Sequence, residues 1–252
     1  MTSTLLIGMG PGLGRALVRA FARDGNKVAF VGRRAEEIKR HESELRAEGL
    51  DVSGHVGDAG DAEAMERIHA DVARTIGPPD VLLYNAAMIE PSRFVTRSGL
   101  EEVKYGTADG WASHGEPVSC DYLMKTLRTN VAGALHAAQS VVPAMMERGT
   151  GTILLTGGVL AFGPWLEWGA TSLGKAALRS LGLSLDKELR PAGIHVCTIA
   201  IHGTMQAGTP YDHDLVAQAY LRLHHEAPAQ WQPEFHFRPD DAGADPDDPE
   251  AR

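Results

Sequence analysis

The first residues suited to chemistry are three glycines near the N-terminus. Gly8, Gly12 and Gly14 stand between a short apolar run that predicts a strand and a periodic segment that predicts a helix. Glycines at such a junction let the backbone turn tightly, and the N–H groups and dipole at the helix start favour a phosphate. The segment from Gly8 to Gly14, which includes Leu13, therefore predicts a dinucleotide-binding turn.

Two arginines, Arg33 and Arg34, end the second predicted strand. Proteins that bind NAD usually carry an acidic residue there, which holds the ribose 2′-hydroxyl. A guanidinium instead matches a 2′-phosphate by charge and by bidentate geometry. We therefore expect NADP(H) rather than NAD(H). The alternative, a merely solvated helix start, is disfavoured because basic residues oppose the dipole at that end.

The elements that carry these residues follow a regular alternation of short apolar runs and longer helical segments, which favours a parallel sheet covered by helices. The predicted strands are residues 4–8, 27–31, 51–56, 81–84, 151–156, 195–200 and 234–237. The predicted helices are residues 13–24, 35–48, 61–76, 121–148, 171–188 and 214–224. The predicted class is α/β, with a Rossmann-like doubly wound parallel sheet in a single domain over residues 1–238.

Motifs along most of the chain resemble those of the short-chain dehydrogenase/reductase family. They are the glycine turn, Val56-Gly57-Asp58, Tyr84-Asn85-Ala86-Ala87, the Asn130 segment, Lys175 and the stretch from Pro191 to Val196. The resemblance implies a family fold that assembles as a homodimer or homotetramer. It implies dinucleotide contacts from Gly8, Gly12, Leu13, Gly14, Arg33, Arg34, Asp58, Ala59, Asn85, Ala86 and Lys175.

In that family a tyrosine is the general acid, a lysine four residues later lowers its pKa, a serine binds the carbonyl oxygen and an asparagine supports a proton relay. Lys175 and Asn130 match the lysine and the asparagine. The tyrosine position holds Thr171 and the serine position holds Gly158, so the chain resembles an atypical group that lacks both. General acid catalysis contributes about 10²–10⁴-fold and an oxyanion donor about 10²–10³-fold. A conventional ketone reductase is therefore not expected, although Thr171 can still hydrogen-bond a substrate.

About twenty residues more than the family usually has separate Asn85 from Asn130. Long loops of this kind are often functional, and this one follows the fourth strand, whose end faces the cofactor. We expect residues 90–118 to form a lid-like segment in which Tyr105, His114 or Glu116 can replace the missing acid. A surface lid without chemistry remains an equal alternative.

Two further histidines lie where they can approach the site. His202 follows the sixth predicted strand and is a candidate substrate contact. His213, between Asp212 and Asp214, is interpreted as part of a helix cap rather than as a metal ligand, and no metal site is predicted.

Composition limits the partners. The chain has 252 residues, 43% of them apolar, and a net charge of −9, which argues against nucleic acid and anionic membranes as partners. Two cysteines are too few for a disulfide framework, which indicates a reducing compartment, so a cytoplasmic protein is expected. The expected partner is a small-molecule substrate. Residues 239–252 hold six acids and one base and predict an acidic disordered tail.

Three hypotheses of function follow. The first is an NADP(H)-dependent oxidoreductase with an altered proton-donor arrangement that acts on a small organic substrate. The second is a redox-neutral isomerase, dehydratase or cyclase that reuses the same pocket. The third is a non-catalytic dinucleotide-binding protein. Lys175 and Asn130 slightly favour an enzyme, but both can also serve binding alone.

Overall fold

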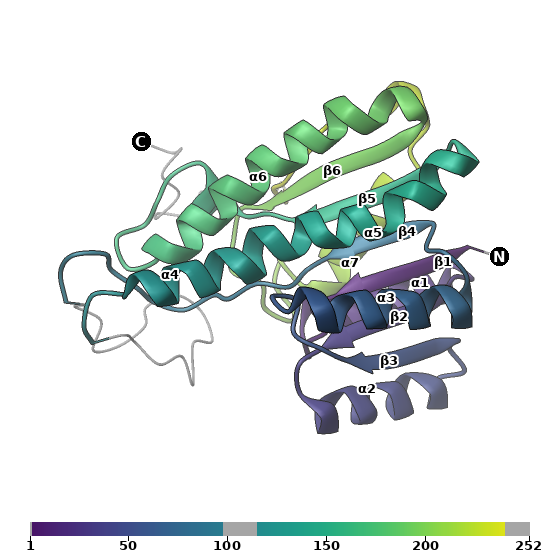
Figure 1. The fold of residues 1–252 in the computed structure, drawn as a ribbon, viewed down its shortest axis with the longest axis horizontal. Coiled ribbons are helices and arrows are strands. Elements are labelled where there is room, and N and C mark those ends of the chain that lie inside the picture. Colours follow the sequence, from purple (N-terminus) through teal and green to yellow (C-terminus); the bar gives the residue numbers. More distant parts are fainter. Residues whose placement is uncertain (1, 98–114, 240–252) are drawn as a thin grey trace.

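The molecule is built on one parallel sheet with helices on both faces (Figure 1). The structure is a computed structural model that describes residues 2–97 and 115–239. Within these ranges seven strands pair in the order β3-β2-β1-β4-β5-β6-β7. The strands are β1 Ser3–Ile7, β2 Lys27–Gly32, β3 Val52–Val56, β4 Val81–Tyr84, β5 Gly151–Thr156, β6 Ile194–Ile201 and β7 Glu234–Phe237.

The helices begin and end close to the expected residues. They are α1 Leu13–Arg23, α2 Ala35–Ala47, α3 Ala62–Ile76, α4 Cys120–Leu127, α5 Gly133–Arg148, α6 Gly169–Leu189 and α7 His213–His224. Short 3₁₀ helices span η2 Val159–Ala161, η3 Arg190–Ala192 and η4 Pro228–Gln230. The single helix predicted over residues 121–148 is interrupted by a π-helical turn, η1 Arg128–Ala132, which the side-chain pattern did not reveal.

Side-chain alternation along the strands divides the core into two layers. Leu6 and Phe30 belong to the layer that packs under α1, α2 and α7. Their neighbours Leu5 and Ala29 point to the other face and pack under α3, α5 and α6. Because both faces are covered, the central strands β1, β4, β5 and β6 are almost fully buried and largely apolar, whereas the edge strands β3 and β7 are partly exposed and carry polar residues. The predicted single-domain α/β fold with a doubly wound sheet is confirmed.

The strand order reverses between β1 and β4, which are neighbours in the sheet although two strands separate them in sequence. From this point the chain winds outward in both directions, so the carboxyl ends of β1 and β4 border a crevice that neither flanking helix closes. None of the helices within the described residues is both long and apolar enough to cross a membrane.

Gly8 fixes the width of this crevice. Its backbone has a φ of +106°, and a β-carbon there would lie 2.2 Å from the backbone nitrogen of Ala86. Neither value is tolerable for a residue with a side chain. Gly10, two residues on, has open space around the same position.

Gly8→Ala should lower the free energy of unfolding by about 3 kcal/mol, because it strains the backbone and pushes apart the ends of β1 and β4. Gly10→Ala is the matched control and should change stability by less than about 0.5 kcal/mol. Urea unfolding followed by circular dichroism measures both. Equal stability of the two variants would contradict the tight packing of β1 against β4.

Candidate functional site

The glycine turn between β1 and α1 is anchored on both sides. The backbone nitrogens of Gly8 and Met9 donate to the carbonyl of Val31 on β2, at 3.0 and 2.8 Å. The side-chain amide of Asn85, just after β4, donates to the carbonyl of Gly8 at 2.8 Å. At the start of α1, Gly12 offers no side-chain cap and the first turn holds no acidic residue. No side chain among the described residues therefore caps the N–H groups at the start of α1 or repels an anion there.

Three cavities follow one another along the strand ends. The largest measures about 550 Å³ and extends from the glycine turn to the start of α6. A smaller cleft of about 220 Å³ shares Gly10, Asn85 and Ala87 with it. A third, of about 380 Å³, shares Met9 and Arg33 with the second. Together they form a continuous crevice with room for an extended dinucleotide across the reversal of strand order.

The smaller cleft suits an adenine ring. Asp58, Ala59 and Ala86, three of the predicted cofactor-binding residues, line it. The carboxylate of Asp58 accepts a hydrogen bond from the backbone nitrogen of Gly60 at 2.8 Å, which fixes the loop after β3. The structure therefore brings together the residues that the sequence assigned to this end.

The third cleft contains both arginines. Arg34 forms an ion pair with Glu37 at 2.6 Å. Arg33 is exposed, lines both the second and the third cleft, and pairs with no carboxylate among the described residues. Of the two guanidinium groups, that of Arg33 is thus the better placed to receive a ribose 2′-phosphate.

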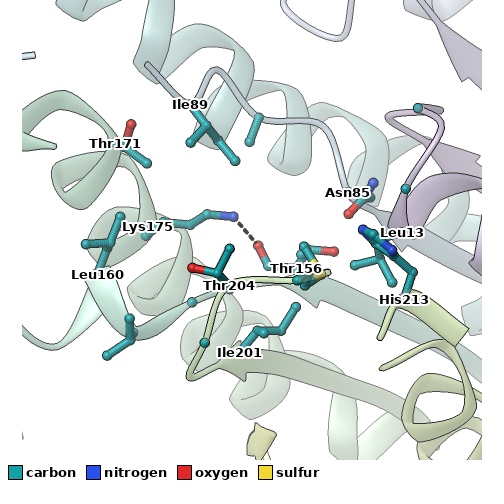
Figure 2. A pocket seen from close by; sticks show the side chains of 18 of the residues that line it. Leu13, Asn85, Ile89, Thr156, Leu160, Thr171, Lys175, Ile201, Thr204 and His213 are labelled. Atoms are coloured by element: carbon teal, nitrogen blue, oxygen red, sulfur yellow. Dashed lines mark hydrogen bonds between the residues drawn. The ribbon is translucent and has the colours of Figure 1, made fainter. Parts of the chain in front are cut away.

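Lys175 is the central polar group of the large cavity. It lies on α6 with only 6% of its surface exposed, and its Nζ donates to the carbonyl of Thr156 at 2.6 Å (Figure 2). Burial lowers the pKa of Lys175 to about 8, because a charged ammonium loses its hydration there. The lysine is therefore still mainly protonated at pH 7 but loses its proton at a lower pH than an exposed lysine.

Thr171 lies one helical turn before Lys175, and Gly158 follows β5 at the same cavity. The Thr171 side chain is 1% exposed, and its hydroxyl has no hydrogen-bond partner among the described residues. A β-carbon at Gly158 would meet nothing nearer than the carbonyl of Ile201 at 3.8 Å, and its φ of 169° is ordinary extended backbone. The fold thus leaves room for a serine at position 158, and no steric demand explains the glycine.

The rest of the cavity wall is largely apolar or aromatic, with Ile89, Leu160, Trp165, Trp168, Ile201 and Met205 among its residues. Of the lining residues, all within the described ranges, only Lys175 and His213 carry ionisable side chains. In Figure 2 Thr171 and His213 lie at opposite ends of the cavity. The end next to Thr171 therefore lacks a described carboxylic acid, phenol or thiol that can donate a proton. Within the described residues no group of histidine, cysteine and acidic side chains is arranged to hold a metal ion.

Asn130 lies in the π-helical turn η1 and is 1% exposed. Its side-chain amide forms two hydrogen bonds with the backbone of Met88. The Oδ1 accepts from the Met88 nitrogen at 2.7 Å, and the Nδ2 donates to the Met88 carbonyl at 3.2 Å. These bonds hold the segment after β4 in place. A role of Asn130 in proton transfer stays a prediction.

The described ends of the predicted insertion are fastened beside the cavity. The carbonyl of Ser92 accepts from the nitrogen of Gly169 at 2.9 Å, and the Arg93 guanidinium pairs with the buried carboxylate of Glu167. Glu116 is exposed and forms an ion pair with Arg97, so it is not a cavity residue. Tyr105 and His114 lie outside the described residues, and the lid hypothesis for them stays a prediction.

The two histidines after β6 behave differently from expectation. His202 is buried, but its Nε2 bonds to the Nδ1 of His236 at 2.8 Å and it does not line the cavity. His202, which the sequence offered only as a candidate substrate contact, thus lies outside the lining of the cavity. The Asp212 carboxylate caps α7 through the nitrogen of Asp214 at 2.9 Å, as expected, whereas His213 itself enters the cavity. The sequence analysis missed this position, because the pattern does not show where the start of α7 lies relative to α1.

Comparison with known proteins agrees with this geometry. Residues 2–216 match the family model for short chain dehydrogenases. The pig protein "Dehydrogenase/reductase SDR family member 4" is 33% identical over 189 residues, which cover 75% of this chain and 61% of the pig protein. Its human counterpart is 31% identical with the same coverage. The chain thus spans about three-fifths of the length of these curated relatives.

Solved structures share the fold at lower identity. A short-chain dehydrogenase from Rhodopseudomonas palustris superposes with a TM-score of 0.75 and 20% identity, covering 94% of this chain and 98% of its own. An actinorhodin polyketide ketoreductase variant, solved with NADPH, gives a TM-score of 0.77 at 20% identity over 93% of this chain and 95% of its own. The glycine turn, the crevice at the reversal of strand order and Lys175 on α6 agree with the family match. The match over residues 2–216 shows that the chain belongs to the short-chain dehydrogenase family.

Proposed function

We propose that the protein is an NADP(H)-dependent oxidoreductase whose acceptor substrate needs no strong acid from the enzyme. One observation carries the proposal: a continuous crevice with dinucleotide-binding features ends in an apolar cavity that keeps Lys175 but has Thr171 and Gly158 at the expected donor positions. Names of relatives, which describe dehydrogenases and reductases, and solved structures with NADPH or NADP support the redox class.

The residues divide the work along the crevice. The turn from Gly8 to Gly14 binds the diphosphate, Asp58 borders the adenine, and Arg33 binds the 2′-phosphate. Lys175 holds the ribose on the nicotinamide side. When bound, the reduced cofactor supplies a hydride to the substrate carbon. The apolar wall excludes water from that end of the cavity.

The missing acid limits the substrate. Reduction of a simple ketone builds negative charge on oxygen, which a general acid and an oxyanion donor normally stabilise. An iminium ion becomes a neutral amine on accepting a hydride and needs no proton. An activated alkene spreads the new charge over a conjugated group, and the resulting enolate takes its proton from solvent rather than from an acid of the enzyme. We therefore propose small apolar iminium compounds or activated alkenes as substrates, with the Thr171 hydroxyl as a hydrogen-bond donor.

The same absence favours a second candidate, a redox-neutral enzyme that keeps the dinucleotide bound, and a non-catalytic binding protein is the third. NADPH oxidation, followed by absorbance with cyclohexanone, cyclohexenone and a cyclic imine, separates them. Oxidation with the imine or the enone, and little with the ketone, is expected. No oxidation with any acceptor, despite tight NADPH binding, would contradict the redox proposal.

The remaining expectations are also proposals. Assembly as a homodimer or homotetramer is supported by exposed apolar side chains on α4, α5 and α6. These are Met124, Leu135, Met146 and Leu173. The cytoplasmic location and the acidic disordered tail over residues 239–252, of which residues 240–252 lie outside the described residues, stay predictions.

Arg33→Ala should weaken NADPH binding by about tenfold while NADH affinity changes less than twofold, because only NADPH carries the 2′-phosphate. Arg34→Ala is the control and should have a smaller effect, since Arg34 already pairs with Glu37. Fluorescence titration of both cofactors measures the four affinities. Unchanged discrimination in Arg33→Ala would refute the assignment.

Restoring the two absent groups should create a ketone reductase. The double variant Gly158→Ser/Thr171→Tyr places a hydroxyl donor one helical turn before Lys175, and its rate with cyclohexanone should rise at least ~100-fold over the wild type. The double variant Gly158→Ser/Thr171→Phe fills the same space without the phenol and should stay inactive. Fast ketone reduction by the wild-type protein would show that another residue supplies the proton.

Lys175→Met should stabilise the ligand-free protein by about 1–2 kcal/mol at pH 7, because the wild type buries a charge that has lost its hydration. The folded protein gives up this proton near pH 8 and the unfolded chain near 10.5, so wild-type stability recovers, and the gain shrinks, as pH rises between these values. Lys187→Met, at an exposed position on the same helix, is the control. Urea unfolding from pH 7 to 10 tests this; a constant gain would contradict the assignment.

A further inference from the structure

His213 opens α7 and faces the glycine turn from the opposite side of the crevice. It lines the large cavity together with the residues from Gly10 to Gly14. In Figure 2 its ring lies beside Leu13 and Asn85, at the end of the cavity away from Thr171. Two helices that are far apart in sequence, α1 and α7, thus bring their first residues to the same point of the crevice.

The imidazole ring of His213 lies close to Gly12, with its Nε2 atom nearest. A β-carbon on Gly12 would lie 2.6 Å from the Nε2 of His213, and the neighbouring ring carbons would lie at 2.9 and 3.5 Å. The ring nitrogen is therefore the atom that approaches the turn most closely. Glycine at position 12 leaves space for the imidazole beside the N–H groups that start α1.

The surroundings leave His213 available to a ligand. The neighbouring carboxylate of Asp212 accepts hydrogen bonds from the backbone nitrogens of Gly208 and Asp214, at 2.6 and 2.9 Å, rather than from the His213 ring. The first turn of α1 carries no acid that would repel a phosphate. His213 is, with Lys175, one of the two ionisable side chains among the described residues that line the cavity.

We propose that His213, which lines the large cavity but not the adenine cleft, is a cofactor-binding residue that donates a hydrogen bond from Nε2 to the nicotinamide-side phosphate of the dinucleotide's diphosphate. The diphosphate then lies between the N–H groups at the start of α1 and the imidazole at the start of α7. This inference rests on the proposed NADP(H) function. It adds a side-chain hydrogen-bond donor to the diphosphate site, which the glycine turn does not supply.

Calorimetric titration of two ligands tests the proposal: NADPH, and adenosine 2′,5′-bisphosphate, which lacks the second phosphate and the nicotinamide riboside. His213→Ala should weaken NADPH binding about tenfold and leave the bisphosphate within twofold. His213→Gln, which keeps an N–H donor, should recover part of the loss. His225→Ala, at the other end of α7 and paired with Asp24, should bind both ligands normally.

NADPH affinity within twofold of the wild type in His213→Ala would overturn the proposal. An equal loss for both ligands would overturn it too, because that result indicates a general disturbance of the crevice. If wild-type protein fails to bind NADPH at all, the proposed function itself falls. That outcome differs from normal wild-type binding with an indifferent His213 variant, which removes only this inference.

Discussion

The close approach of Gly8 to the backbone of Ala86 is the constraint on which the crevice depends. It requires a residue without a side chain and with positive φ at the end of β1. The bond from Asn85 to the Gly8 carbonyl then joins the glycine turn to β4. With these two contacts in place, the start of α1 lies open at the reversal of strand order. The cavities on either side take their shape from this junction.

At the opposite end of the same crevice, the buried Lys175 lowers the stability of the ligand-free protein. Lys175 is buried among apolar and aromatic side chains with one carbonyl partner, the Thr156 oxygen. A buried cation of this kind destabilises the empty fold and becomes useful when a ligand supplies further hydrogen-bond partners. The proposed function follows from a cavity that keeps this lysine but has Thr171 and Gly158 at the expected tyrosine and serine positions.

Local patterns in the sequence predicted most of the fold. Apolar runs gave the strands, and β4, β5 and β7 begin and end at the expected residues. The glycine spacing and the arginines after β2 predicted phosphate-binding features for a physical reason, since each needs a particular residue type at one position. The residues predicted to contact adenine line one cleft of the structure, and their binding role stays a prediction.

Contacts between distant segments were beyond such reasoning. The π-helical turn forms where the Tyr84 hydroxyl bonds to the Thr129 carbonyl and the Asn130 amide holds Met88, and neither contact leaves a periodic signal. His202 was a candidate substrate contact, but it bonds to His236 on the neighbouring strand, and only the order of strands in the sheet brings these two residues together. His213 was interpreted as part of a cap because the sequence does not show that α7 starts opposite α1.

The most direct test of the central claim is isotope transfer from NADPH deuterated at the reactive carbon of the nicotinamide ring. The protein is incubated with a cyclic imine or cyclohexenone, and the product is analysed by mass spectrometry. If the bound dinucleotide is the hydride donor, the product carries one deuterium on the carbon that accepts the hydride, transferred from one face of the nicotinamide only. Product formation without deuterium from either face of the cofactor would contradict a hydride-transfer role for the bound dinucleotide.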